Sequence, residues 1–72
     1  MSRSYIARIE DVRGGDFPEA TARCLLAGCN WCQVYNSATV RKVKLAAQLG
    51  ALAHLRGAHG KRVRTDRIWT DK

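Results

Sequence analysis

The sequence predicts a small α+β fold in which short antiparallel strands, two of them paired as a hairpin, pack on one long α-helix in the C-terminal half. Two local observations point to it: strand-forming runs separated by turn compositions fill residues 1–36, and residues 38–56 contain no proline and one glycine, Gly50. The length of 72 residues allows one domain with one small core. Because such a core supplies little net stability, we expect a metal ion, a disulfide or a partner to stabilise the fold.

The first half of the chain is expected to form three short strands. Residues 5–12 are rich in strand-forming side chains with partial alternation, and the glycines and proline of residues 13–18 favour a turn. Residues 20–26 and 31–35 predict a second strand and a returning strand, with a bend at residues 27–30. The result would be a hairpin with an added N-terminal strand.

The helix is the element that the sequence marks most clearly. Asn36 and Ser37 offer an N-cap, and the helix is expected to run from residue 38 to residue 56. Gly57 follows where a left-handed C-cap residue is expected, and Arg56 lies in the last turn, where a cation suits the helix dipole. We therefore expect the helix to end at Gly57.

Two apolar stripes run along this predicted helix. One recurs at steps of three and four residues and is expected to face the core together with His54; it consists of Val40, Val43, Ala47 and Ala51. The other, called here the leucine stripe, consists of Leu45, Leu49, Leu52 and Leu55. Since one stripe suffices to cover the sheet, the leucine stripe is expected to meet the N-terminal strand or a partner chain.

The net charge of +7 lies wholly in the second half of the chain. Residues 1–36 carry equal numbers of basic and acidic side chains, whereas residues 37–72 carry nine basic and two acidic ones. A neutral half followed by a basic half predicts a scaffold with an anion-binding surface, and nucleic acid is the commonest polyanion inside cells. No apolar run is long enough for a membrane span, and residues 1–6 lack the apolar core of a signal peptide, so we expect a cytoplasmic protein without membrane contact.

The cysteines and histidines are grouped at two places in the chain. Cys24, Cys29 and Cys32 fall within nine residues, and His54 and His59 lie together near the end of the predicted helix. Two close ligand pairs, one from a turn and one from a helix end, suit a tetrahedral zinc ion. The spacing allows three ligand sets: the first two cysteines with both histidines, the last two cysteines with both histidines, or three cysteines with one histidine. A disulfide is not expected, because the cysteine count is odd and no secretion signal is visible.

Residues 23–63 resemble the Cys2His2 zinc-finger family. The stretch Arg23-Cys-Leu-Leu-Ala-Gly-Cys-Asn-Trp31 resembles the finger knuckle, and residues 51–60 resemble the end of its helix. The chain is similar to small zinc fingers of actinobacteria and their phages, which implies the cytoplasm of the host if it is phage-encoded. The resemblance implies a ββα-like fold with an added strand, a structural zinc ion on Cys24, Cys29, His54 and His59, and Cys32 as a free thiol or alternate ligand.

The spacing departs from the family pattern at one point. The family has about twelve residues between the second cysteine and the first histidine, and this chain has twenty-four. His54 and His59 are five residues apart and would point about 140° apart on an unbroken helix, so we expect the last turn to loosen at Gly57. Residues 1–60 are expected to form a single zinc-finger-like domain and residues 61–72 a basic tail, with local order around Ile68 and Trp69.

Catalysis is not expected. Two cysteines and two histidines fill a tetrahedron, whereas a catalytic zinc ion keeps an open position. The sequence contains no phosphate-binding loop and no serine, histidine and aspartate arrangement typical of nucleophilic catalysis. We therefore expect a binding protein and not an enzyme.

The first functional hypothesis is nucleic-acid binding, with DNA favoured over RNA, through phosphate contacts of the helix and the tail. The residues expected to make them are Arg41, Lys42, Lys44, Arg56, Lys61, Arg62, Arg64 and Arg67. The alternative is a protein-interaction module that docks through the leucine stripe on a partner protein or a second copy of itself. In a phage such a module could modulate or inhibit a protein complex of the host. Mutations in the tail and in the leucine stripe distinguish the two hypotheses.

Overall fold

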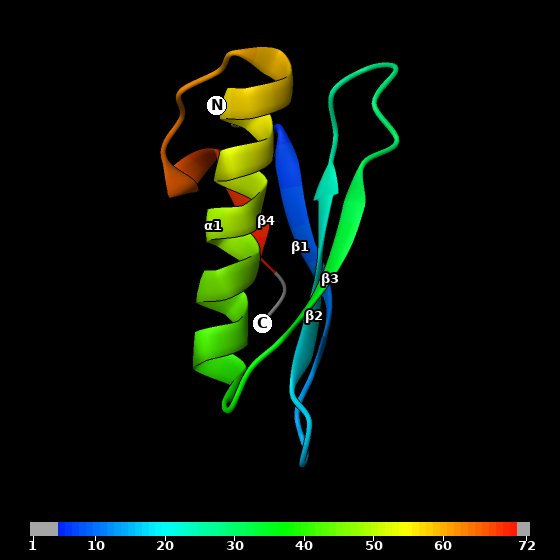
Figure 1. Ribbon diagram of the computed structural model, residues 1–72, viewed down its shortest axis with the longest axis vertical. Coiled ribbons are helices and arrows are strands. Elements are labelled where there is room, and N and C mark those ends of the chain that lie inside the picture. Colours follow the sequence, from blue (N-terminus) through cyan, green and yellow to red (C-terminus); the bar gives the residue numbers. More distant parts are fainter. Residues whose placement is uncertain (1–4, 71–72) are drawn as a thin grey trace.

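The computed structural model describes residues 5–70, which form a four-stranded sheet covered on one face by a single long helix (Figure 1). This confirms the predicted α+β class. No helix among these residues combines the length and apolar character needed to cross a bilayer. In chain order the elements are β1 (Ala7–Arg13), β2 (Glu19–Cys24), β3 (Cys32–Asn36), α1 (Val40–His59), the 3-10 turn η1 (Thr65–Arg67) and β4 (Ile68–Thr70).

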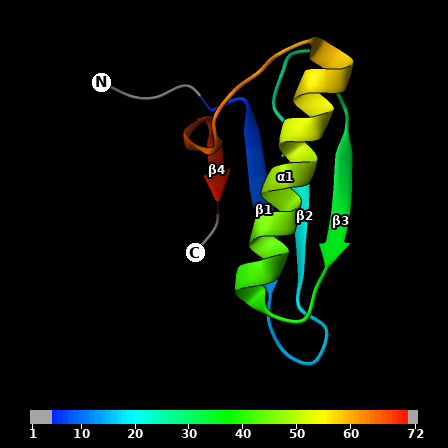
Figure 2. The ribbon, with the colours of Figure 1, turned by 60° about the vertical axis from the view of Figure 1, so that its left-hand side comes forward.

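The sheet is mixed, with the strand order β3-β2-β1-β4. The strands β1, β2 and β3 pair antiparallel in the order of the chain, as expected for a hairpin with an added N-terminal strand. The short strand β4 lies parallel to β1, with Ala7 opposite Ile68. In Figure 2, β4 and β3 form the two edges of the sheet, and α1 crosses in front of the central strands.

The core lies between α1 and the helix-facing side of the sheet, and small side chains dominate it. Alanine provides half of the buried hydrophobic side chains among the described residues, which are Ala7, Ile9, Ala20, Ala22, Cys24, Val43, Ala47, Ala51, Leu55 and Ile68. Small side chains bury little area each, so the hydrophobic contribution to folding is modest. The opposite face of the sheet carries Arg8, Glu10 and Arg23, whose side chains pair with one another.

Both helix ends differ from the expected positions. Asn36 is the last residue of β3, so the chain needs a connection before the helix begins, and Thr39 is the N-cap, its hydroxyl accepting from the amide of Lys42 at 3.1 Å. At the other end α1 passes through Gly57 and stops at Gly60, which has the left-handed φ of 63°. The amides of Gly60 and Lys61 donate to carbonyls of the last turn.

The orientation of the helix shows that one residue of the predicted leucine stripe, Leu55, was assigned to the wrong face. The face against the sheet consists of Val43, Ala47, Ala51 and Leu55. Leu55 is completely buried and therefore belongs to the core, not to the exposed leucine stripe. Leu45 and Leu49 remain about half exposed, at 54% and 57%, and Leu52 is partly buried.

Part of the segment expected to form a basic tail belongs to the fold. After α1 the chain returns along the helix, forms η1 and enters the sheet as β4. Ile68 is buried in the core, and Gln48 of α1 donates a hydrogen bond to the Thr70 hydroxyl at 3.0 Å. Residues 1–4 of the predicted domain and residues 71–72 of the predicted tail lie outside the described part of the chain.

The two glycines of α1 predict opposite effects of alanine on stability. A Cβ at Gly50 would overlap the hydroxyl end of the Tyr35 ring, whereas a Cβ at Gly57 would meet no atom within 4 Å. Alanine is favoured over glycine in a helix interior by about 1 kcal/mol. We expect Gly57→Ala to raise the free energy of unfolding by roughly that amount and Gly50→Ala to lower it, measured by denaturant unfolding of the metal-loaded protein. A destabilising Gly57→Ala would indicate that the helix ends at Gly57 after all.

Candidate metal centre

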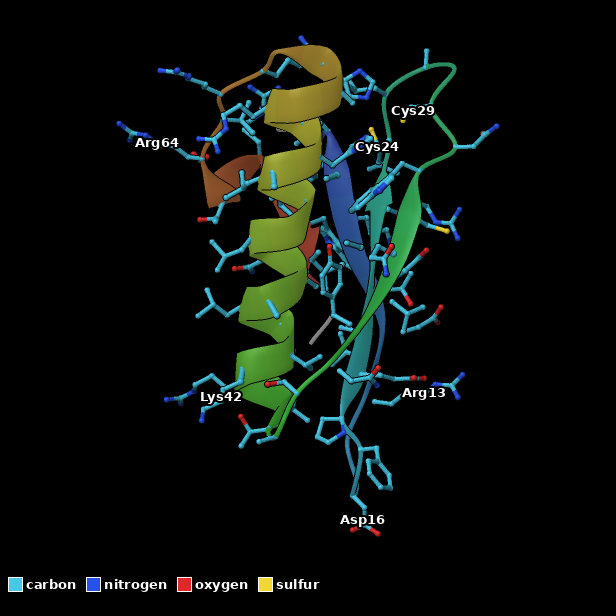
Figure 3. The ribbon with its side chains drawn as sticks, viewed as in Figure 1. Arg13, Asp16, Cys24, Cys29, Lys42 and Arg64 are labelled. Atoms are coloured by element: carbon cyan, nitrogen blue, oxygen red, sulfur yellow. The ribbon has the colours of Figure 1, made fainter. Side chains whose placement is uncertain are left out.

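Four potential metal ligands converge at one end of the molecule, between the β2–β3 hairpin and the last turns of α1. Cys24 ends β2, Cys29 lies in the hairpin loop, and His54 and His59 lie on α1. Their ligand atoms all lie within 4.8 Å of one another. Figure 3 shows Cys24 and Cys29 beside the C-terminal end of the helix. These four residues are called the metal cluster below.

The hairpin loop places the two sulfurs by its backbone. The Cys24 amide donates to the carbonyl of Trp31 at 3.0 Å, which closes the hairpin, and the Cys29 amide donates to the carbonyl of Leu26 at 3.1 Å. Between them Gly28 has a φ of 79°, a conformation that glycine adopts without steric cost. The glycine directly before the second cysteine therefore lets the loop turn both sulfurs toward the helix.

The long spacing between Cys29 and His54 is explained by the two elements between them, the strand β3 and the first fourteen residues of the helix α1. From Cys29 the chain leaves the hairpin loop and descends along β3 (Cys32–Asn36), which is about 13 Å long at the rise of a strand. From Val40 to His54 it climbs fourteen residues, about 21 Å at the rise of a helix. The helix thus returns the chain to the end of the molecule where the hairpin loop lies, and the ligands on either side of the twenty-four intervening residues come together.

The two histidines reach different sulfurs from an unbroken helix. His54 Nε2 lies 3.4 Å from Cys29 Sγ, and His59 Nε2 lies 3.6 Å from Cys24 Sγ. The rings are nearly perpendicular, with centroids 5.0 Å apart. The expected loosening at Gly57 is not observed, because α1 continues to His59. Side chains five residues apart point in different directions around a helix, so His54 and His59 each approach a different cysteine.

Trp31 supports the cluster, a role that the interpretation of the sequence missed. Its ring stacks on His54 with centroids 4.3 Å apart and an angle of 9° between the planes. The stacked ring restricts the orientation of the imidazole, as groups around metal ligands commonly do. The signal in the sequence was an aromatic residue two positions after Cys29.

Burial favours the neutral forms of two ligands of the cluster, Cys24 and His54. Burial raises the pKa of the Cys24 thiol, and the neighbouring Cys29 adds to the increase. Burial lowers the pKa of His54, and the charge that His59 can carry lowers it further. Neutral imidazole is the ligating form of histidine, whereas a thiol must lose its proton to a metal ion, so metal binding at this cluster releases protons.

Cys32 lies outside the cluster. It begins β3 opposite Arg23, and its side chain is exposed. Successive side chains of a strand point to opposite faces, so Arg23 and its partner Cys32 face away from the helix, whereas the adjacent Cys24 faces toward it. The structure therefore brings together Cys24 and Cys29, and not the alternative pair of Cys29 and Cys32.

The residues predicted to bind nucleic acid follow the outer side of α1 and the segment after it. Lys42 and Arg64 project to the same side of the molecule, away from the sheet (Figure 3). Lys44 is partly buried, and the rest of the set is exposed: Arg41, Lys42, Arg56, Lys61, Arg62, Arg64 and Arg67. By contrast, arginines of the strands are paired, Arg8 and Arg23 with Glu10 and Arg13 with Glu19.

No protein-family model, curated protein or solved structure matches the chain. The structure itself places two cysteines at the β2–β3 hairpin and two histidines toward the end of the following helix, an arrangement compatible with a Cys2His2 zinc site.

A measurement of metal affinity distinguishes the roles of Cys24 and Cys32. We expect the protein to bind one equivalent of Zn²⁺, and Cys24→Ser to weaken binding by more than about 100-fold, beyond the usual loss from an outer-shell change. Competition with a chromogenic chelator measures this affinity. Cys32→Ser is the matched control and should bind as the unchanged protein does. Equal losses in the two variants would contradict the assignment.

The shifted pKa values predict a stability plateau for the metal-free protein. The contribution of His54, whose pKa is lowered by folding, is complete above about pH 6.5 and is lost as the pH falls through the folded-state pKa. The contribution of Cys24, whose pKa is raised, is complete below about pH 8.5 and is lost as the pH rises. Denaturant unfolding at a series of pH values measures both limbs. We expect His54→Asn to flatten the acid limb and Cys24→Ala the alkaline limb; unchanged limbs would contradict the assigned causes.

Proposed function

We propose that the protein is a zinc-stabilised module that binds nucleic acid mainly through phosphate contacts. The single observation that carries the first part is the convergence of the metal cluster. A zinc ion with bond lengths of about 2.3 Å to sulfur and 2.0–2.1 Å to nitrogen holds tetrahedral sulfur and nitrogen ligands about 3.5 Å apart. The separations of 3.4 and 3.6 Å between sulfur and nitrogen in the cluster agree with that value.

The metal would have a structural role. Four protein ligands complete a tetrahedron and leave no position for a substrate, so we propose no enzymatic activity. Structural zinc binding in finger peptides corresponds to about 10–16 kcal/mol of apparent free energy coupled to folding. A core made largely of alanine gains the most from such a contribution, because its own buried area is small.

The distribution of ion pairs supports an anion-binding surface on the helix side. Within residues 5–70, no carboxylate pairs with the side chains of Arg41, Lys42, Lys44, Arg56, Lys61, Arg62 or Arg64. The pairs shown above neutralise arginines of the strands instead. The positive field of the protein is therefore concentrated on α1 and the segment that follows it, which favours contact with a polyanion at this side.

The surroundings of Trp69 and Tyr35 favour phosphate contacts over base stacking by these two rings. The guanidinium of Arg8 lies 4.6 Å above the Trp69 ring and covers one of its faces. Tyr35 packs against Gly50 of the helix. Arg8 occupies one face of Trp69 and the helix occupies one side of Tyr35, so we propose contact through phosphates, with duplex DNA as the target.

Salt dependence tests this function. With about five phosphate contacts, the logarithm of the affinity for duplex DNA should fall with the logarithm of salt concentration at a slope of about −4 to −5. Removing two contacts with Arg62→Gln and Arg64→Gln together should reduce the slope by about 2. Fluorescence anisotropy with zinc-loaded protein measures both.

The matched control is Arg13→Gln, which removes one positive charge from a residue that already pairs with Glu19. Its slope should remain close to that of the unchanged protein. An affinity that does not depend on salt, or an equal change in the control, would contradict the proposed function.

A further inference from the structure

The outer side of α1 combines exposed apolar side chains with positive charge at both ends. Leu45, Leu49 and Leu52 lie within a narrow arc of the helix, since residues three, four and seven apart share a face. Arg41 and Lys42 lie one turn before the first leucine, and Arg56 lies one turn after the last. The side chains on this arc are therefore apolar in the middle and cationic at the ends.

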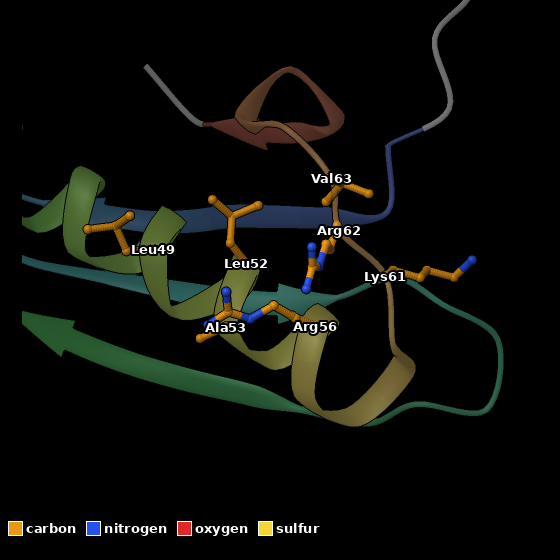
Figure 4. Close-up of a pocket in the computed structure, with 7 residues that line it drawn as sticks. All are labelled: Leu49, Leu52, Ala53, Arg56, Lys61, Arg62 and Val63. Atoms are coloured by element: carbon orange, nitrogen blue, oxygen red, sulfur yellow. The ribbon is translucent and has the colours of Figure 1, made fainter.

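A groove borders the second half of this arc. It has a volume of about 510 Å³ and lies between α1 and the chain that follows it (Figure 4). Its apolar part consists of Leu49, Leu52, Ala53 and Val63. Its basic part consists of Arg56, Lys61 and Arg62. The groove is open to solvent and does not enclose a ligand on all sides.

A second hollow borders the first half of the arc. It measures about 480 Å³ and is lined by Val40, Arg41, Lys44, Leu45 and Gln48. Leu45 of this hollow and Leu52 of the groove are seven residues apart, which is about 10.5 Å along the helix. Apolar residues seven positions apart on a second helix have the same separation, so one helix can present a side chain to each hollow.

We propose that this side of α1 docks an acidic amphipathic helix of a partner protein, with two large apolar side chains seven residues apart and carboxylates at both ends. The apolar side chains fill the two hollows. The carboxylates meet Arg41 and Lys42 at one end and Arg56, Lys61 and Arg62 at the other. The charge complementarity of this arrangement identifies the occupant as acidic.

Other occupants fit the surface less well. A second copy of the chain would bring the same cations against this side, and like charges in contact are repulsive. A nucleic acid backbone offers charge to the ends of the arc and no aliphatic group to the leucines between them. A flat bilayer surface does not enter two separate hollows.

The inference goes beyond nucleic-acid binding but shares five cationic residues with it, Arg41, Lys42, Arg56, Lys61 and Arg62. A test must therefore change the apolar part and leave the charge unchanged. Ala53→Phe fills the groove from an exposed position of α1, and Leu49→Gln removes part of its apolar lining from another. Val34→Phe is the control, because it places the same ring on exposed strand β3, away from the groove.

The probe is a fluorescent synthetic helix of alanine and glutamate with two leucines seven positions apart, titrated into zinc-loaded protein. We expect saturable binding, amide shifts in the protein around Leu49 and Ala53, and weakening by about tenfold or more when the peptide leucines are replaced by serine. Ala53→Phe and Leu49→Gln should weaken binding similarly, and Val34→Phe should not. Zinc stoichiometry and circular dichroism establish that each variant is folded.

Three outcomes would overturn the proposal. The serine peptide could bind as well as the leucine peptide, which would reduce the interaction to charge. The apolar variants could leave peptide binding unchanged, or the protein alone could form a dimer through Leu45 and Leu49, which would make a second copy the occupant. If the protein fails the DNA salt-dependence test but binds the leucine peptide as expected, only the proposed nucleic-acid binding is contradicted. The two tests are independent in this way because Ala53→Phe and Leu49→Gln change no charge.

Discussion

The junction of the β2–β3 hairpin with the end of α1 is the constraint on which the rest of the structure depends. At this junction two sulfurs and two imidazole nitrogens lie within 4.8 Å. The neighbouring core is built from alanines and a few larger side chains, so hydrophobic burial alone contributes little there. A metal ion held by the four ligands would fix the helix end against the hairpin more strongly than such a core does, and the basic surface on α1 would take its position from that attachment.

Most of the fold could be predicted from local signals in the sequence. The structure differs from the prediction where tertiary contacts determine the bounds or the existence of an element. Strand-forming runs and a proline-free segment are properties of a few neighbouring residues, and they located three strands and the helix. Gly57 and Gly60 are the same residue type three positions apart, and only the backbone distinguishes the one inside the helix from the left-handed cap. The strand β4 has three residues, and its pairing with β1 provides the structure that its own sequence cannot specify.

Spacing alone narrowed the possible sets of metal ligands to three, and the geometry of the strands selects one of them. Cys24 and Cys32 sit on paired strands, but their side chains lie on opposite faces of the sheet, which sequence spacing does not encode. Periodicity placed His54 on the stripe expected to face the core and Leu55 on the leucine stripe. In the structure Leu55 is buried against the sheet, and His54 lies beside the hairpin loop, where its ring stacks on Trp31. The excess of charge in the second half was visible, but the pairing of strand arginines with Glu10 and Glu19 was not.

The alanines between helix and sheet have a consequence for the chemistry at the far end of the molecule. Ala20, Ala22, Ala47 and Ala51 are fully buried, so methyl groups set how closely α1 approaches β2. Cys24 is two residues beyond Ala22 on that strand, and His54 is three residues beyond Ala51 on that helix. The spacing between α1 and β2 therefore contributes to the separation of the ligands that these two elements carry. A single added methylene in this layer would push the helix and the sheet apart and change the separation of the ligand atoms, so the alanines help to set the geometry of the candidate metal site.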